Sequence, residues 1–187
     1  MQTNAWTVQK MTATALLIAV GIAIPIFSPV KILLEPASFT LASHVAIFVA
    51  MMISPATAVG VTVGTTVGFA LGGFPPVIVL RAATHLVFAT AGSLYLKRRP
   101  GTLSSPVQVH VFSFLIAIIH AVCEVVVVCA FYFSGNLVAF EASGFFRSVI
   151  LLVGVGTVVH SMIDLEIALV IFKALCKQRG FKAMAGK

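Results

Sequence analysis

Charged residues are scarce in this sequence. Only 9% of its 187 residues are charged, whereas a soluble domain averages about 25%. Hydrophobic residues make up 60% of the chain, and the mean hydropathy is +1.12. A soluble fold of this size has too little interior to hide so much apolar surface. The composition therefore excludes a soluble globular domain and predicts an integral membrane protein.

Several motifs are missing as well. The three cysteines, Cys123, Cys129 and Cys176, show no C-x-x-C spacing, which favours neither a disulfide framework nor a zinc site. The sequence contains no G-x-S-x-G nucleophile elbow, so nothing points to covalent catalysis. It also contains no Walker A sequence. We expect a protein that is not an enzyme, and any ATP that drives it must be hydrolysed by another chain.

The apolar runs predict a single domain, residues 1–187, built as an all-α bundle of six transmembrane helices. A span needs about 20 apolar residues, or somewhat fewer where polar loops cap it. The first run has no clean small-x-small cleavage site, and five more runs follow it, so it is a span and not a signal peptide. The expected spans are residues 11–27, 41–53, 57–73, 77–96, 107–133 and 147–174.

The cations predict the orientation. Positively charged residues gather in cytoplasmic loops and tails. With both termini inside, the outer side carries only Lys31 and Arg147, and Arg81 lies within a span. The inner side then carries nine cations: Lys10, Lys97, Arg98, Arg99, Lys173, Lys177, Arg179, Lys182 and Lys187. We therefore expect cytoplasmic termini, and we attribute the positive net charge to topology and not to nucleic-acid binding.

The connection between the first two spans, residues 28–40 ("SPVKILLEPASFT"), is unusually apolar for an outer loop. It carries Lys31 and Glu35 four residues apart, a spacing that permits a weak surface ion pair. Because so many hydrophobic residues disfavour exposure to water, we expect this loop to fold over the bundle as a lid.

Two spans carry stripes of small residues. Such stripes allow close helix packing in lipid, either within the protein or against another membrane subunit. Both readings remain open from spacing alone. The stripes are Ala15, Ala19 and Ala23 in the first span and Gly60, Gly64, Gly68 and Gly72 in the third.

Three spans each hold a polar pair at i and i+4, a spacing that places both side chains on one helix face. Ionisable groups inside a membrane usually face the bundle interior and mark a substrate or ion path. The repetition therefore predicts a polar interior. The pairs are Arg81 and His85, His120 and Glu124, and His160 and Asp164.

Depth along the spans suggests how these groups are used. Arg81, His85 and His44 lie toward the outer ends of their spans, beneath the loop that carries Glu35. We expect a substrate site there that also includes Phe39 as a stacking ring, Glu124 near mid-membrane and Asn136 in the last outer loop. Phe69 and Phe74 are further stacking candidates near the mouth. Arg147 is expected to be an interfacial anchor.

The deeper groups leave alternatives open. His160 and Asp164 are predicted to form a structural hydrogen bond nearer the cytoplasm. A rival reading makes Glu124, His160 and Asp164 the proton relay of an autonomous carrier, and another makes the protein a membrane subunit without a ligand. A metal site is not expected, because the possible ligands lie at different depths and neither H-x-x-x-H nor H-E-x-x-H occurs.

Taken together, these features resemble the substrate-binding S components of energy-coupling factor (ECF) vitamin transporters over essentially the whole chain. The segments "LEPASFTLASH" (34–44) and "VLRAATH" (79–85) look like the niacin and hydroxymethylpyrimidine branch. Cobalt and nickel members of the group need an N-terminal Met-His, whereas this chain begins Met1-Gln2-Thr3. The resemblance therefore favours a vitamin over a metal as the cargo, and it requires no cofactor.

The resemblance implies a prokaryotic cell-membrane protein that captures a vitamin from outside. It would deliver the vitamin while docked on a transmembrane coupling subunit that carries two cytoplasmic ATPases. Ala15, Ala19 and Ala23 match the docking motif of the family. Arg81 offers a planar fork suited to the carboxylate of nicotinate. An ionised Glu35 would instead suit the exocyclic amine of hydroxymethylpyrimidine, so the sequence leaves both vitamins open.

Overall fold

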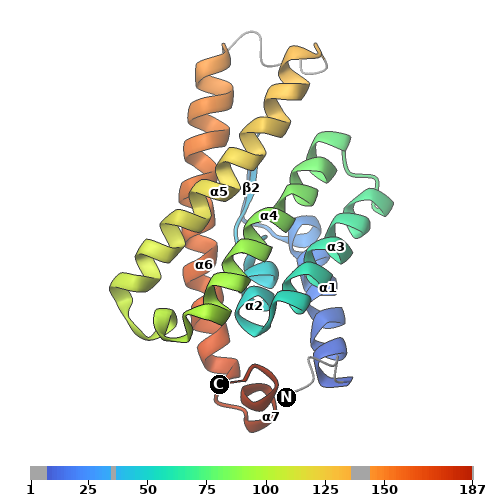
Figure 1. Ribbon diagram of the computed structural model, residues 1–187. Coiled ribbons are helices and arrows are strands. Elements are labelled where there is room, and N and C mark those ends of the chain that lie inside the picture. The colour runs from blue at the N-terminus through green and yellow to red at the C-terminus, as the bar shows by residue number, and fades with distance from the viewer. Residues whose placement is uncertain (1–7, 35–36, 136–143, 187) are drawn as a thin grey trace.

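The computed structural model describes residues 8–34, 37–135 and 144–186, which are largely helical (Figure 1). Within these ranges, four helical segments are long and apolar enough to cross a membrane. This confirms an all-α membrane protein. The segments are α1 (Val8–Phe27), α4 (Pro76–Arg98), α5 (Pro106–Phe133), and Phe146–Leu175, in which a π-helix, Phe146–Val155, leads into α6, Gly156–Leu175.

The second and third expected spans are shorter helices. The helix α2, Val45–Ile53, has nine residues, and α3, Pro55–Leu71, has 17. At 1.5 Å per residue, α2 extends about 14 Å, which is roughly half of a hydrocarbon core. Ser54 separates the two helices and caps α3, since its side chain accepts a hydrogen bond from the Thr57 N–H at 3.2 Å. The expected helix over 41–53 is thus too long, because residues 41–44 form a turn.

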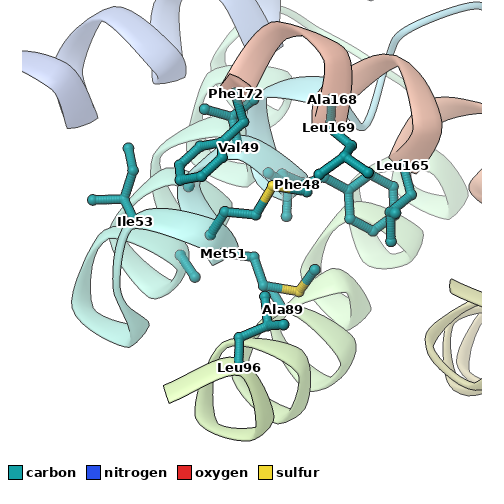
Figure 2. Close-up of a cluster of buried hydrophobic side chains, with 14 of the residues drawn as sticks. Phe48, Val49, Met51, Ile53, Ala89, Leu96, Leu165, Ala168, Leu169 and Phe172 are labelled. Atoms are coloured by element: carbon teal, nitrogen blue, oxygen red, sulfur yellow. The ribbon is translucent and has the colours of Figure 1, made fainter. Parts of the chain in front are cut away.

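The short helix α2 lies at the centre of the fold, where it contacts α1, α3, α4 and α6. All nine of its residues are buried. Figure 2 shows its side chains packed among residues of α4 and α6. A helix that is apolar on every side belongs in such an enclosed position. The packed residues include Phe48, Val49 and Met51 of α2, Ala89 and Leu96 of α4, and Leu165, Ala168 and Leu169 of α6.

The expected lid loop contains a β-hairpin, which is a departure from a purely helical fold. Strand β1, Lys31–Leu34, pairs antiparallel with β2, Ala37–Thr40, and the Phe39 backbone lies opposite Ile32. Glu35 lies outside the described residues. The Leu41 N–H donates to the Val30 carbonyl at 3.1 Å, which closes the base of the hairpin beside the turn into α2.

Asp164 of α6 holds that turn in place. Its Oδ1 accepts a hydrogen bond from the Ala42 N–H at 2.8 Å, and its Oδ2 accepts one from the His44 N–H at 2.9 Å. Ala42 has φ 67°, a left-handed conformation that is strained for a residue with a side chain. The buried carboxylate compensates for this strain, so the position of His44 depends on a residue that is distant in the sequence.

The two small-residue stripes face different surroundings. A methyl group on Gly64 would lie 2.7 Å from Ile18 Cγ1, and one on Gly68 would lie 2.6 Å from Ile22 Cγ1. These glycines therefore serve packing between α3 and α1. Ala15 and Ala19 are exposed, and Ala23 is half-buried. Ala15 and Ala19 therefore do not serve helix packing within this protein.

The structure shows where several of the positively charged segments lie. The start of α1, the end of α6 and the short helix α7, Arg179–Met184, lie at one end of the bundle (Figure 1). The 3-10 helix Pro100–Ser104 connects α4 to α5, and exposed Lys97, Arg98 and Arg99 precede it.

We predict that Asp164→Ala lowers the thermal unfolding midpoint of the detergent-purified protein. The change leaves the Ala42 and His44 N–H groups without their acceptor, and each such loss costs about 1–3 kcal/mol. The matched control is Glu166→Ala on the same helix, which removes a partly exposed carboxylate 3.3 Å from exposed His110, an interaction worth about 0–1 kcal/mol. Equal midpoints for the two variants would contradict this role of Asp164.

Candidate functional site

A cavity of about 80 Å³ lies inside the bundle and is lined by α1, the hairpin and turn, and all the helices from α2 to α6. One part of its lining is aromatic and the other polar. The aromatic residues are Phe39, Phe69 and Phe74, and the ionisable ones are His44, Arg81, His85, Glu124 and His160. The combination of flat apolar surfaces with a few fixed polar groups is typical of small-molecule sites.

Glu124 of α5 is the first centre of the polar part. Its Oε2 accepts a hydrogen bond from Arg81 Nη2 at 2.8 Å and another from Thr157 Oγ1 at 2.7 Å. Its Oε1 lies 3.4 Å from His85 Nε2. The buried ion pair with Arg81 thus joins α4 to α5, and the Thr157 hydroxyl adds α6. Such a pair is stable in the interior only when further hydrogen bonds support it, as they do here.

His44, at the start of α2, is the second centre. Its ring centroid lies 4.8 Å from that of His85, 4.7 Å from that of His120 and 5.0 Å from that of His160. Its Nδ1 lies 3.1 Å from Asp164 Oδ2. His44 therefore links the region around Glu124 to the region around Asp164, and four imidazoles, from the turn before α2 and from α4, α5 and α6, meet in one place.

Phenylalanine rings form the apolar part. Phe69 at the end of α3 stacks on Phe74, with centroids 4.7 Å apart and planes 29° apart. The Phe39 ring covers Gly156, where an added methyl group would lie 2.6 Å from Phe39 Cζ. The same ring lies 5.5 Å from the ring of His160. Phe39 thus places the end of the hairpin against the start of α6.

Five of the seven predicted substrate residues line this cavity together. They are Phe39, His44, Arg81, His85 and Glu124. The other two, Glu35 and Asn136, lie outside the described residues. Arg147 is exposed, near the beginning of the segment Phe146–Leu175.

The predicted separation by depth is wrong. We expected His44 near the outer surface and His160 with Asp164 nearer the cytoplasm. In the structure, Ser43 hydrogen-bonds to His160 and His44 to Asp164. The reason is that the hairpin and turn carry the chain into the bundle before α2 begins. Both residues make the structural hydrogen bonds that we expected, His160 to Ser43 and Asp164 to the turn, but His160 also lines the cavity.

Sequence reasoning did not select Ser43 and Thr157. Ser43 Oγ lies 3.1 Å from His160 Nε2, and Thr157 donates to Glu124. The helical spacing could have identified Thr157, because Thr157, His160 and Asp164 lie at i, i+3 and i+7 and so share one helix face. No local pattern marks Ser43, whose position depends on the turn.

Comparison with known proteins gives one informative relative. The niacin transporter NiaX of Lactococcus lactis subsp. cremoris (strain MG1363) is 41% identical over 176 residues, which cover 94% of this chain and 78% of NiaX. No family model matches the sequence. No solved structure matches it either. The identity and coverage confirm the resemblance found in the sequence: the chain belongs to the niacin transporter family of ECF S components.

Proposed function

We propose that this protein binds niacin in the cavity between its helices and serves as the receptor for uptake of the vitamin. The proposal rests on one observation: the Arg81 guanidinium and the stacked rings of Phe69 and Phe74 line the same cavity. Nicotinate offers one feature for each, a carboxylate and a flat heteroaromatic ring. The 41% identity to a niacin transporter supports the same substrate.

The hydrogen bonds of the cavity favour nicotinate over hydroxymethylpyrimidine. The Arg81 guanidinium donates to Glu124 through Nη2, and a planar guanidinium is suited to pair with a substrate carboxylate. An aminopyrimidine needs an acceptor instead, but Glu124 Oε2 already accepts from Arg81 and Thr157.

The proposed membrane arrangement has six helical passes, with α2 and α3 as the short ones and both termini in the cytoplasm of a bacterial cell. Exposed cations near the end of α4 and around α7 support this orientation. The hairpin is proposed as a lid, which is supported by Phe39 and Thr40 at the wall of the cavity. Opening of this segment would admit the substrate from outside.

The proposed partners are an ECF transmembrane coupling subunit and two cytoplasmic ATPases. The protein itself would be non-catalytic. Ala15 and Ala19 on the exposed face of α1 are the proposed contact with the coupling subunit. Small side chains there allow a partner helix to approach closely in lipid. A shallow apolar groove lined by Ala23, Phe27 and Leu41 extends this face.

A proton-coupled carrier is the second candidate function. It is favoured by the series of buried contacts from Glu124 through His85 and His44 to Asp164, in which the two imidazole rings touch edge to face. Several of its members already have other roles, however. Asp164 accepts two backbone hydrogen bonds, and Glu124 is paired with Arg81. We therefore rank this function below that of a receptor.

We predict that Arg81→Lys reduces the preference of the purified protein for nicotinate over nicotinamide by about tenfold or more. Lysine retains the positive charge beside Glu124 but loses the planar fork that pairs with a carboxylate. Nicotinamide lacks the carboxylate, so the ratio of its dissociation constant to that of nicotinate isolates this contact. The control is Arg147→Lys, at an exposed position. An unchanged ratio in Arg81→Lys would mean that Arg81 only holds Glu124.

We predict that the double variant Ala15→Phe, Ala19→Phe retains nicotinate binding but no longer co-purifies with the coupling subunit. Bulky side chains on the exposed face of α1 block close approach of a partner helix and leave the cavity untouched. Ala83→Phe on the exposed face of α4 is the matched control. Co-purification of the double variant at the level of the control would rule out this docking face.

A further inference from the structure

Four potential metal ligands converge beside the cavity. One ring nitrogen from each of His44, His85 and His120 and one carboxylate oxygen of Glu124 all lie within 4.8 Å of one another. They come from the turn before α2, from α4 and from α5. A metal site was not expected, partly because these ligands were predicted to lie at different depths, and that reason no longer holds.

His120 supplies an independent sign of an occupant. Its side chain is fully buried, yet neither Nδ1 nor Nε2 makes a hydrogen bond in the described part of the chain. Its Nε2 lies 3.4 Å from Glu124 Oε1, outside hydrogen-bonding geometry. Burying a polar ring without partners is unfavourable, and an unsatisfied buried group calls for an explanation. A bound cation at Nε2 provides one.

The neighbouring groups are oriented as metal ligands usually are. Arg81 and Thr157 both bond to Oε2 of Glu124, so Oε1 remains directed at His85 Nε2 and His120 Nε2, each 3.4 Å away. His44 Nδ1 lies 3.1 Å from the Asp164 carboxylate, which leaves Nε2 as its ligand atom. Histidine ligands typically donate their second nitrogen to a carboxylate in this way.

We propose that His44, His85, His120 and Glu124 bind a divalent transition-metal ion of the Zn²⁺ type. Three imidazoles with one carboxylate suit Zn²⁺, Co²⁺ or Ni²⁺, whereas Ca²⁺ and Mg²⁺ prefer oxygen ligands alone. Ligand atoms about 2.1 Å from a tetrahedral ion lie about 3.4 Å from one another. The ligand atoms, now within 4.8 Å of one another, would therefore have to draw together by up to about 1.4 Å on binding the ion.

The charges of the site favour a cation. Among the buried side chains described, the two carboxylates of Glu124 and Asp164 outnumber the one guanidinium, that of Arg81. With neutral imidazoles the core carries one excess negative charge, which a divalent ion would offset in a setting of low dielectric constant. His44, His85 and Glu124 also line the cavity, so the ion would lie at its wall. The proposal does not depend on niacin as the substrate.

The test is a titration with Co²⁺ of the metal-stripped full chain, purified in detergent through an affinity tag without histidine. We expect about one ion per chain and the intense visible absorption of a four-coordinate Co²⁺ site, displaced by Zn²⁺. The weak absorption of six-coordinate Co²⁺, or no stoichiometric binding, would overturn the proposal. Nicotinate affinity is measured separately in metal-free buffer, so loss of the metal site and loss of the proposed function are distinguishable.

Variants locate the site. His120→Asn removes a ligand that does not line the cavity, and we expect it to weaken Co²⁺ binding by at least about tenfold. His110→Asn on the same helix, where the side chain is exposed, should leave binding unchanged. If His120→Asn is not monodisperse, His85→Asn takes its place. Loss of binding in the His110 variant, or full binding in the cluster variants, would contradict the assignment.

Discussion

The fold depends on the burial of one carboxylate, that of Glu124, inside a bundle surrounded by lipid. A lone buried carboxylate is strongly unfavourable in such a medium. Here Arg81 from α4 and Thr157 from α6 bond to one of its oxygens at 2.8 and 2.7 Å. The requirement to satisfy this group fixes the relative positions of α4, α5 and α6. The same groups then form the polar part of the cavity.

Asp164 has a corresponding role for the remaining elements. By accepting hydrogen bonds from two backbone N–H groups of the turn, it holds the hairpin and the start of α2 against α6. His44 lies between the two carboxylates and contacts three other imidazoles. The two polar clusters are therefore linked at His44, which directly precedes the helix α2, and the side chains of α2 pack in the apolar core (Figure 2).

Composition and helical spacing were sufficient to predict the membrane class, the four long helices and the pairing of polar residues on shared faces. These features are local, so they can be read from neighbouring residues. The meeting of His44 with Asp164 could not be predicted, because it joins residues 120 positions apart. This contact depends on the turn at residues 41–44 and on the short length of α2. Neither could be predicted, because residues 41–53 form one apolar run in the sequence. Thr157 could have been predicted from its helical spacing to His160 and Asp164, whereas no spacing marks Ser43.

The account describes a receptor that binds niacin and relies on partners for energy. The most direct test is uptake of radiolabelled nicotinate into vesicles that contain this protein, with and without the coupling subunit and its two ATPases. We expect nicotinate to bind but not to accumulate when the protein is alone, even under a pH gradient. Accumulation should require the full complex and internal ATP on the side of the ATPases. Uptake by the protein alone, driven by the pH gradient, would contradict the account and establish a proton-coupled carrier.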